Sequence, residues 1–187
     1  MKNFFKDFFS VKMIALNAII AAIYAVLTIA SGPLSYNYFQ FRVSEFLNLL
    51  VFFNPSYTLG LTIGCLIANL ASFAGIYDIV FGTLATLVSC LLMIPFAKLT
   101  KNLFFATFIP SLINAITVPF IIYLASLGTG DEFALTSIMY FTMFGWTFLG
   151  EFLAITILGY VIFMPLMKKV HSFPKLINAR TNLDFKW

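Results

Sequence analysis

Ionisable side chains inside apolar segments are the residues of this chain best suited to chemistry. Arg42 and Glu45 stand three residues apart at the start of one apolar run, and Glu151 stands deep in another. Of the 11 Lys and Arg residues, Arg42 is the one that lies far from the basic ends and from the one basic loop. A charged side chain at the centre of a membrane costs about 2.5–3.5 kcal/mol on insertion scales. Each of these groups therefore needs a partner, a cavity or a function.

Structural roles compete with functional ones for these groups. Arg42 and Glu45 could form an i,i+3 ion pair that neutralises itself on one helix face. Asp78 stands at the edge of an apolar run and could simply cap a helix N-terminus. Glu151 has no cation near it in the sequence. The sequence therefore favours a functional role most clearly for Glu151.

The composition is that of a polytopic membrane protein. The chain has 187 residues, of which 61% are hydrophobic and 10% are charged. A soluble domain of this size has too little interior to bury so much apolar surface. The basic residues flank the apolar runs instead of forming a stripe, so nucleic acid is not an expected partner. Cys65 and Cys90 fall inside apolar runs and are expected to be buried thiols without a disulfide.

Basic segments set the expected topology. They occupy the N-terminus, the loop from Lys98 to Lys101 and the tail at 168–187, and the positive-inside rule places all three in the cytoplasm. An even number of crossings must then lie between the N-terminus and Lys98. The break at Asn54-Pro55-Ser56 must therefore separate two short helices instead of kinking a single long one. The acidic loop with Asp131 and Glu132 then falls outside the cell.

We thus predict an all-α membrane protein with six transmembrane helices and both termini in the cytoplasm. Residues 1–187 form a single integral-membrane domain, which ends in the basic cytoplasmic tail. The helices are expected at roughly 11–31, 41–53, 56–73, 76–98, 104–127 and 136–167.

Two stripes of small residues indicate close helix contacts. Such stripes let helices approach each other inside a membrane, where lipid removes the hydrophobic drive for association. One stripe can serve the bundle, and a second leaves a face for another subunit, although both could pack internally. The stripes are Ala15, Ala18, Ala22 and Ala25 in the first helix, and Gly60, Gly64, Ala68 and Ser72 in the third.

Polar residues of the apolar segments gather in the outer half of the predicted bundle. Carboxylates and carboxamides that converge beside aromatic rings could form a pocket for a small polar ligand, open to the exterior. The candidate residues are Arg42, Glu45, Asn69, Tyr77, Asp78, Asn114, Trp146 and Glu151. No phosphate-binding loop is present, and the single histidine, His171, lies in the tail. We therefore expect that the protein is not an enzyme and that it holds neither a metal ion nor a cofactor.

Three sequence blocks resemble the QueT family. They are Q-F-R-V-S-E at 40–45, G-L-T-I-G-C-L-I-A-N at 60–69 and Y-D-I-V-F-G-T-L-A-T-L at 77–87, and Asn114-Ala115 and Gly150-Glu151 fit the same pattern. The resemblance implies the substrate-binding S component of an energy-coupling factor (ECF) transporter in the bacterial cell membrane. Such a subunit would take up a queuosine precursor, a 7-deazaguanine with an aminomethyl or nitrile group.

The resemblance also implies partners. The S component binds substrate outside and docks through an alanine face, matched here by Ala18 and Ala22, onto a membrane T component. Two cytoplasmic ATPases then drive release. An S component for another vitamin or purine-like compound, or a membrane scaffold or regulatory subunit, is the alternative.

The candidate residues suit a deazaguanine. A carboxylate can accept both donors of the guanine-like edge, a second carboxylate can pair with an aminomethyl cation, and aromatic faces can stack on the ring. Our hypothesis is that Glu151 reads this edge, with Asp78 or Glu45 nearby and with Asn69 and Asn114 completing the site. Replacing Glu151 with Gln should then lower affinity far more than replacing Asp131.

Overall fold

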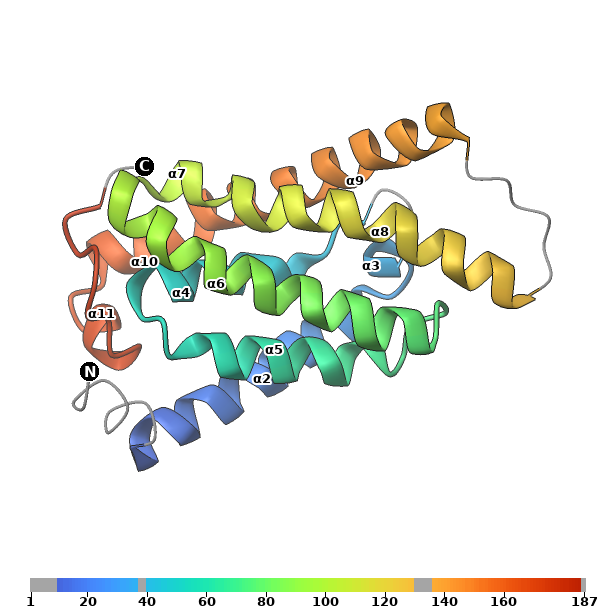
Figure 1. Ribbon diagram of the computed structural model, residues 1–187. Coiled ribbons are helices and arrows are strands. Elements are labelled where there is room, and N and C mark those ends of the chain that lie inside the picture. The colour runs from blue at the N-terminus through green and yellow to red at the C-terminus, as the bar shows by residue number, and fades with distance from the viewer. Residues whose placement is uncertain (1–9, 37–39, 130–135, 186–187) are drawn as a thin grey trace.

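The protein is a bundle of helices (Figure 1). The computed structural model describes residues 10–36, 40–129 and 136–185, and over these residues it forms helices and no strand. The predicted acidic loop with Asp131 and Glu132 lies outside the described residues. The elements are α2 (Val11–Ser31), α3 (Pro33–Tyr36), η1 (Val43–Asn48), α4 (Leu49–Phe53), α5 (Tyr57–Asn69), η2 (Asp78–Gly82), α6 (Thr83–Thr100), α7 (Leu103–Ala106), α8 (Phe108–Thr129), α9 (Ser137–Leu158), η3 (Gly159–Phe163), α10 (Met164–Lys169) and α11 (Phe173–Leu176). Element η1 is a 3-10 helix, whereas η2 and η3 are π-helical.

Within the described residues, four continuous helices are long and apolar enough to cross a membrane. They cover Val11–Ser31, Asp78–Thr100, Leu103–Leu127 and Ser137–Lys169. Two shorter apolar helices, Val43–Phe53 and Tyr57–Asn69, lie on either side of the break at Asn54 and Pro55. The prediction of an all-α, multi-pass membrane protein is thus confirmed, while six crossings and cytoplasmic termini stay predictions.

The glycines of α5 pack against α2. A Cβ atom added at Gly60 would lie 2.6 Å from the backbone oxygen of Asn17, and one added at Gly64 would lie 2.8 Å from that of Ala21. The Asn17 side chain joins the two helices, because its Oδ1 accepts the Gly60 N–H at 2.8 Å while its Nδ2 donates to the Met13 carbonyl at 2.9 Å. The glycine stripe therefore serves the interior of the bundle.

Replacing Gly60 with alanine should lower the free energy of unfolding by about 1–3 kcal/mol, because the added carbon overlaps the α2 backbone. Gly145 of α9 is the matched control, since a Cβ there meets nothing within 4 Å. Thermal midpoints of the purified proteins in detergent check this prediction. Gly145→Ala should match the wild type or exceed it slightly, as alanine favours helices. Equal midpoints for the two variants would contradict the proposed contact.

The alanine stripe of α2 lies largely on the opposite side of that helix. Ala15, Ala18 and Ala22 are exposed, and only Ala25 is buried, at 5% exposure. The buried face is formed by Met13, Asn17, Ala21, Tyr24, Ala25 and Thr28. Most of the stripe is therefore available for contact with another molecule.

Helix α4 is a short, fully buried helix whose end is covered by the C-terminal tail. The Phe53 carbonyl accepts hydrogen bonds from the backbone N–H groups of Arg180 and Thr181, at 2.9 and 3.0 Å. The Phe52 carbonyl accepts from the Thr181 hydroxyl at 3.0 Å and from Asn182 Nδ2 at 2.8 Å. The last carbonyls of a helix have no partner within it, and burial makes an external donor necessary. The tail supplies these donors.

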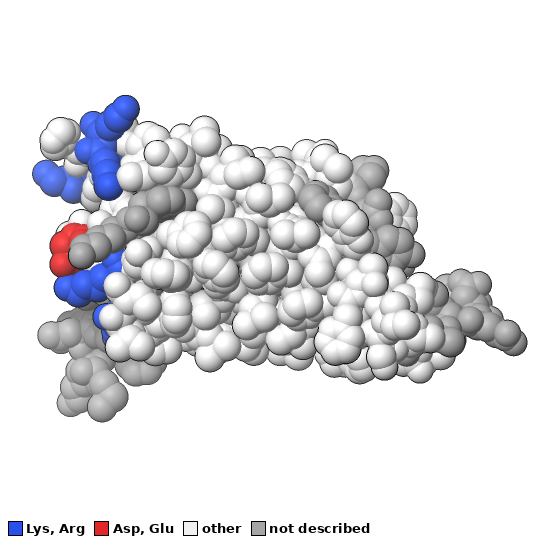
Figure 2. All heavy atoms as spheres, turned by 90° about the horizontal axis from the view of Figure 1, so that it is seen from above, with Lys and Arg blue, Asp and Glu red and all other residues white. Residues whose placement is uncertain are grey.

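Basic side chains gather at one end of the molecule. Figure 2 shows the visible Lys and Arg atoms at the end where α10 and α11 lie in Figure 1, with uncharged surface over the rest of the described face. Residues at this end include Lys98, Lys101, Lys168, Lys169 and Lys175, which flank or follow the long helices. This distribution is the one that the positive-inside rule associates with a cytoplasmic end.

Candidate functional site

A buried polar network surrounds Glu45 of η1. One Glu45 carboxylate oxygen accepts a hydrogen bond from the Tyr24 hydroxyl, and the other accepts one from Asn48 Nδ2. The Arg42 guanidinium lies 4.0 Å from Glu45 Oε1 and 3.9 Å from Asp78 Oδ2. All five side chains are buried. The predicted pair of Arg42 and Glu45 exists, but it does not stand alone, because Asp78 shares the guanidinium.

The 3-10 geometry of η1 explains this alignment. A 3-10 helix has three residues per turn, so residues i and i+3 lie directly above one another. Glu45 and Asn48 follow this spacing within η1 and therefore point toward the same side, and Arg42 is the N-cap residue that immediately precedes the helix. Polar side chains on a single face need only one polar neighbourhood in an otherwise apolar bundle.

The π-helical segment η2 positions Asp78. Asn69 at the end of α5 donates through Nδ2 to the Asp78 backbone carbonyl at 2.9 Å. A Cβ atom added at Gly82 would clash with Asp78 Oδ1 and would lie 2.8 Å from Asn69 Nδ2. Gly82 is thus required for the Asp78 and Asn69 side chains to pack together. π-helical turns of this kind occur frequently at functional sites.

Glu151 and Asn114 form a second polar group between α9 and α8. Asn114 Nδ2 donates to Glu151 Oε1 at 3.1 Å, and both side chains are buried. Glu151 Oε2 has no hydrogen-bond partner among the described residues. Because α9 packs against η1, Glu151 lies close enough to Glu45 and Arg42 to interact with them electrostatically. A buried carboxylate with one unsatisfied oxygen is poised to bind a donor.

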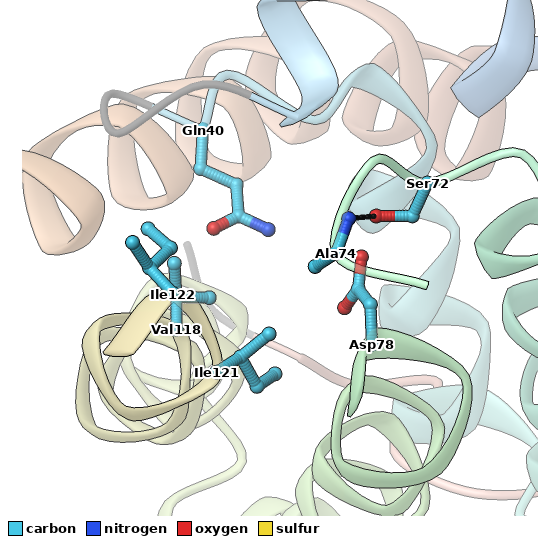
Figure 3. Close-up of a pocket in the computed structure, with 7 residues that line it drawn as sticks. All are labelled: Gln40, Ser72, Ala74, Asp78, Val118, Ile121 and Ile122. Atoms are coloured by element: carbon cyan, nitrogen blue, oxygen red, sulfur yellow. Dashed lines mark hydrogen bonds between the residues drawn. The ribbon is translucent and has the colours of Figure 1, made fainter. Parts of the chain in front are cut away.

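A pocket opens beside Asp78 at the end of the bundle opposite the basic residues. Figure 3 shows Gln40 and Asp78 pointing toward the same space, with side chains of α8 along another side. The cavity measures about 40 Å³, and its lining consists of Gln40, Ser72, Ala74, Asp78, Val118, Ile121 and Ile122. Asn114 lies one helical turn before Val118 on α8, so the Glu151 group lies deeper in the bundle than this pocket.

The site holds more acidic than basic groups. Among the residues that the structure describes, Arg42 is the one buried Lys or Arg, whereas Glu45, Asp78 and Glu151 are three buried carboxyl side chains. Buried charges are normally paired, because an isolated ion loses its hydration without compensation. A positively charged ligand would reduce this imbalance.

The structure brings together most of the candidate site residues. Arg42, Glu45, Asp78 and Asn69 form the first network, and Asn114 and Glu151 form the neighbouring pair. Tyr77 is half-buried, and Trp146 is 54% exposed on the outer face of α9, so neither belongs to the buried group.

Sequence reasoning missed three residues of this region. Tyr24 donates to Glu45 from α2, a contact between distant segments that leaves no local signal. Asn48 continues the three-residue spacing of Arg42 and Glu45, and that spacing could have identified it. Gln40 begins the block Q-F-R-V-S-E but was not recognised as a site residue.

Comparison with known proteins places the chain in a family. Residues 14–168 match the family model described as QueT transporter. The chain belongs to the QueT transporter family. It is 49% identical over 73 residues to "Queuosine precursor transporter QueT" of Lactococcus lactis subsp. cremoris (strain MG1363). That match covers 38% of this chain and 43% of the relative, so the aligned part spans less than half of the relative's length. No solved structure matches the chain.

Family membership confirms the resemblance drawn from the sequence blocks. It also agrees with the expectation that the chain is not an enzyme, because the family is one of transporters. Together with the four helices of membrane-spanning length, it identifies a multi-pass protein of the bacterial cell membrane.

Proposed function

We propose that the chain binds a queuosine precursor of the 7-deazaguanine class, as the substrate-binding subunit of an ATP-driven ECF-type importer. The observation that carries the proposal is an excess of buried carboxyl groups beside a pocket at one end of the bundle: among the described residues, Glu45 and Asp78 share the one buried guanidinium, and Glu151 is a third buried carboxyl group nearby. The name of the Lactococcus relative supports the substrate class. The clustering of basic residues at the opposite end supports a pocket that faces the exterior.

Two carboxyl groups are the candidates for direct ligand contact. Both oxygens of Glu45 already accept hydrogen bonds from Tyr24 and Asn48, so Glu45 acts as a positioning residue for Arg42. Asp78 lines the pocket, and Glu151 retains an unsatisfied oxygen deeper in the bundle. These positions support contact of Asp78 with the guanine-like edge and of Glu151 with the aminomethyl cation. This assignment reverses the one that the sequence suggested for Glu151.

Ligand binding requires the pocket to widen. A cavity of about 40 Å³ holds only a few water molecules at roughly 10–15 Å³ each. A bicyclic deazaguanine needs more room than this. Ile121 and Ile122 of α8 border the cavity, so their side chains, or α8 itself, must move outward when the ring enters.

The exposed alanines of α2 support docking onto a membrane T component, with two cytoplasmic ATPases driving release. Ala18 and Ala22 lie one helical turn apart on the surface of α2, on a face that the glycines of α5 leave uncovered. Small residues on an exposed face allow a partner helix to approach closely within the membrane.

Uptake by cells tests both parts of the proposal. The chain is expressed with an ECF module in a bacterial strain that can neither synthesise nor import queuosine precursors, and queuosine in tRNA is measured after supplying aminomethyl-deazaguanine. Ala18→Trp and Ala22→Trp should each lower uptake by roughly tenfold or more, because overlap at a packed contact costs about 1–3 kcal/mol. Ligand binding by the purified variants should be unchanged.

The matched control is Leu91→Trp on α6, where the wild-type side chain is 51% exposed. This variant should support normal uptake. Equal loss of uptake in all three variants would contradict a docking role for the alanine face. Absence of uptake by the wild-type chain would contradict the transport proposal itself.

A further inference from the structure

The buried side-chain amide of Gln40 faces the pocket and has a hydrogen-bond acceptor without a donor among the described residues. Its side chain is 4% exposed, and its Oε1 has no hydrogen-bond partner among the described residues. Figure 3 shows the amide pointing into the pocket across from the Asp78 carboxylate. Leaving a buried acceptor without a donor costs about 1–3 kcal/mol, so a donor from a ligand would be favourable here.

The backbone holds Gln40 in an uncommon conformation. Its φ of 42° lies in the left-handed region, which side chains other than glycine seldom occupy. The Gln40 carbonyl accepts a hydrogen bond from the Arg42 N–H at 2.9 Å, so the turn is tied to the start of η1. Strained backbone conformations of this kind cluster at functional sites, where the surrounding structure maintains them. The conformation aims the amide at the pocket and links its position to that of Arg42.

We propose that Gln40 is a specificity-determining residue that pairs with the lactam of the ligand ring, an inference that rests on the proposed function. A side-chain amide offers one acceptor and two donors, and a ring lactam offers one N–H and one carbonyl. Gln40 Oε1 accepts the ring N–H while Nε2 donates to the ring carbonyl. Asp78, on the other side of the pocket, accepts the exocyclic amino group.

This pairing divides the ligand between two parts of the site. The hydrogen-bonding edge of the ring lies between Gln40 and Asp78 in the pocket, against the apolar side chains of α8. The substituent on the five-membered ring points toward Asn114 and Glu151, one turn deeper along α8. Gln40 thereby selects rings with a 6-oxo group, independently of the charge of the substituent.

Changing one ligand group and one residue at a time tests the assignment. Affinities of the purified chain are measured for aminomethyl-deazaguanine and for two analogues, one without the 6-oxo group and one without the 2-amino group. In the wild type, loss of the 6-oxo group should weaken binding by about 10–100-fold, since buried partners are left unpaired. In Gln40→Met, the same ligand change should cost less than about threefold, because the amide is already gone.

The 2-amino analogue is the internal control. Removing the 2-amino group should weaken binding by the same factor in the wild type and in Gln40→Met, because Asp78, and not Gln40, accepts the hydrogen bond from that group. Gln40→Glu keeps the shape of the side chain but cannot donate to the carbonyl at neutral pH, so it should also lose discrimination for the 6-oxo group. Gln40→Glu can therefore be used for the same test if Gln40→Met does not fold.

The outcomes separate the inference from the function on which it rests. A wild-type chain that binds no deazaguanine overturns the proposed function. A wild-type chain that binds, together with Gln40 variants that still discriminate fully for the 6-oxo group, overturns the role of Gln40 alone. Discrimination lost in both Gln40 variants, with unchanged dependence on the 2-amino group, establishes it.

Discussion

Replacing Glu151 with glutamine is expected to weaken binding of aminomethyl-deazaguanine by roughly 100-fold, because removing one partner of a buried charge pair costs about 2–5 kcal/mol. Glutamine keeps the size of the side chain and can still accept the hydrogen bond from Asn114, which is 3.1 Å long in the native protein. A loss of affinity would therefore reflect the loss of the negative charge. The nitrile compound carries no cation, and the same substitution should weaken its binding by less than about tenfold. Calorimetric titration of the purified variant measures both affinities.

Asp184→Asn is the matched control for this substitution. Asp184 is an exposed carboxylate that pairs with Lys101 at 2.9 Å. Its replacement should leave both affinities unchanged. Wild-type affinity for the aminomethyl compound in Glu151→Gln would remove Glu151 from the binding site, and an equal loss for both ligands would contradict its assignment to the ammonium group.

Replacing Arg42 with methionine is expected to lower the free energy of unfolding by about 3–5 kcal/mol, because Glu45 and Asp78 then become uncompensated buried charges. The pairs that are lost lie at 4.0 and 3.9 Å in the native protein. Adding Glu45→Gln and Asp78→Asn should recover part of the loss, since these changes remove the charges left behind. Thermal midpoints of the purified proteins in detergent provide the measurement.

Lys101→Met breaks an ion pair as well, but at the surface. Lys101 and Asp184 are 56% and 70% exposed, and exposed pairs contribute about 0–1 kcal/mol. The midpoint should therefore change little. If the Lys101 and Arg42 variants melt at the same temperature, Arg42 does not hold the polar network together.

The helical segments were predictable because apolar runs and breaks are local features. The run from Val11 and the break at Asn54 and Pro55 mark elements whose type depends on nearby residues. The 3-10 geometry of η1 and the π-helical turn at Asp78 were not predictable in this way. Both depend on tertiary contacts, such as the packing of Asn69 against Asp78.

The basic tail shows most clearly what the sequence conceals. Its composition indicated a charged cytoplasmic segment, and its described Lys residues, Lys168, Lys169 and Lys175, belong to or follow α10 and α11 at the basic end. Its backbone and polar side chains, however, cover the end of α4, through contacts such as that of Thr181 with Phe52. These partners lie 129 residues apart in the chain. No local pattern encodes so distant a contact.

The candidate site was predictable in its members more than in its arrangement. Ionisable residues in apolar runs identified Arg42, Glu45, Asp78 and Glu151, because burying such groups is costly without a reason. Their division into an ion-pair network and a separate Glu151–Asn114 pair required the structure. The two small-residue stripes likewise look equivalent in the sequence, and only packing distinguishes the buried glycines from the exposed alanines.

Direct binding is the measurement that tests the central claim. Aminomethyl- and cyano-deazaguanine are titrated into the purified chain in detergent, with riboflavin, thiamine and folate as comparison ligands. The account predicts that the deazaguanines bind without any partner subunit and that the three vitamins do not. Binding of one of the vitamins would contradict the substrate class, and binding of none of the five compounds would contradict a substrate-binding role for the chain.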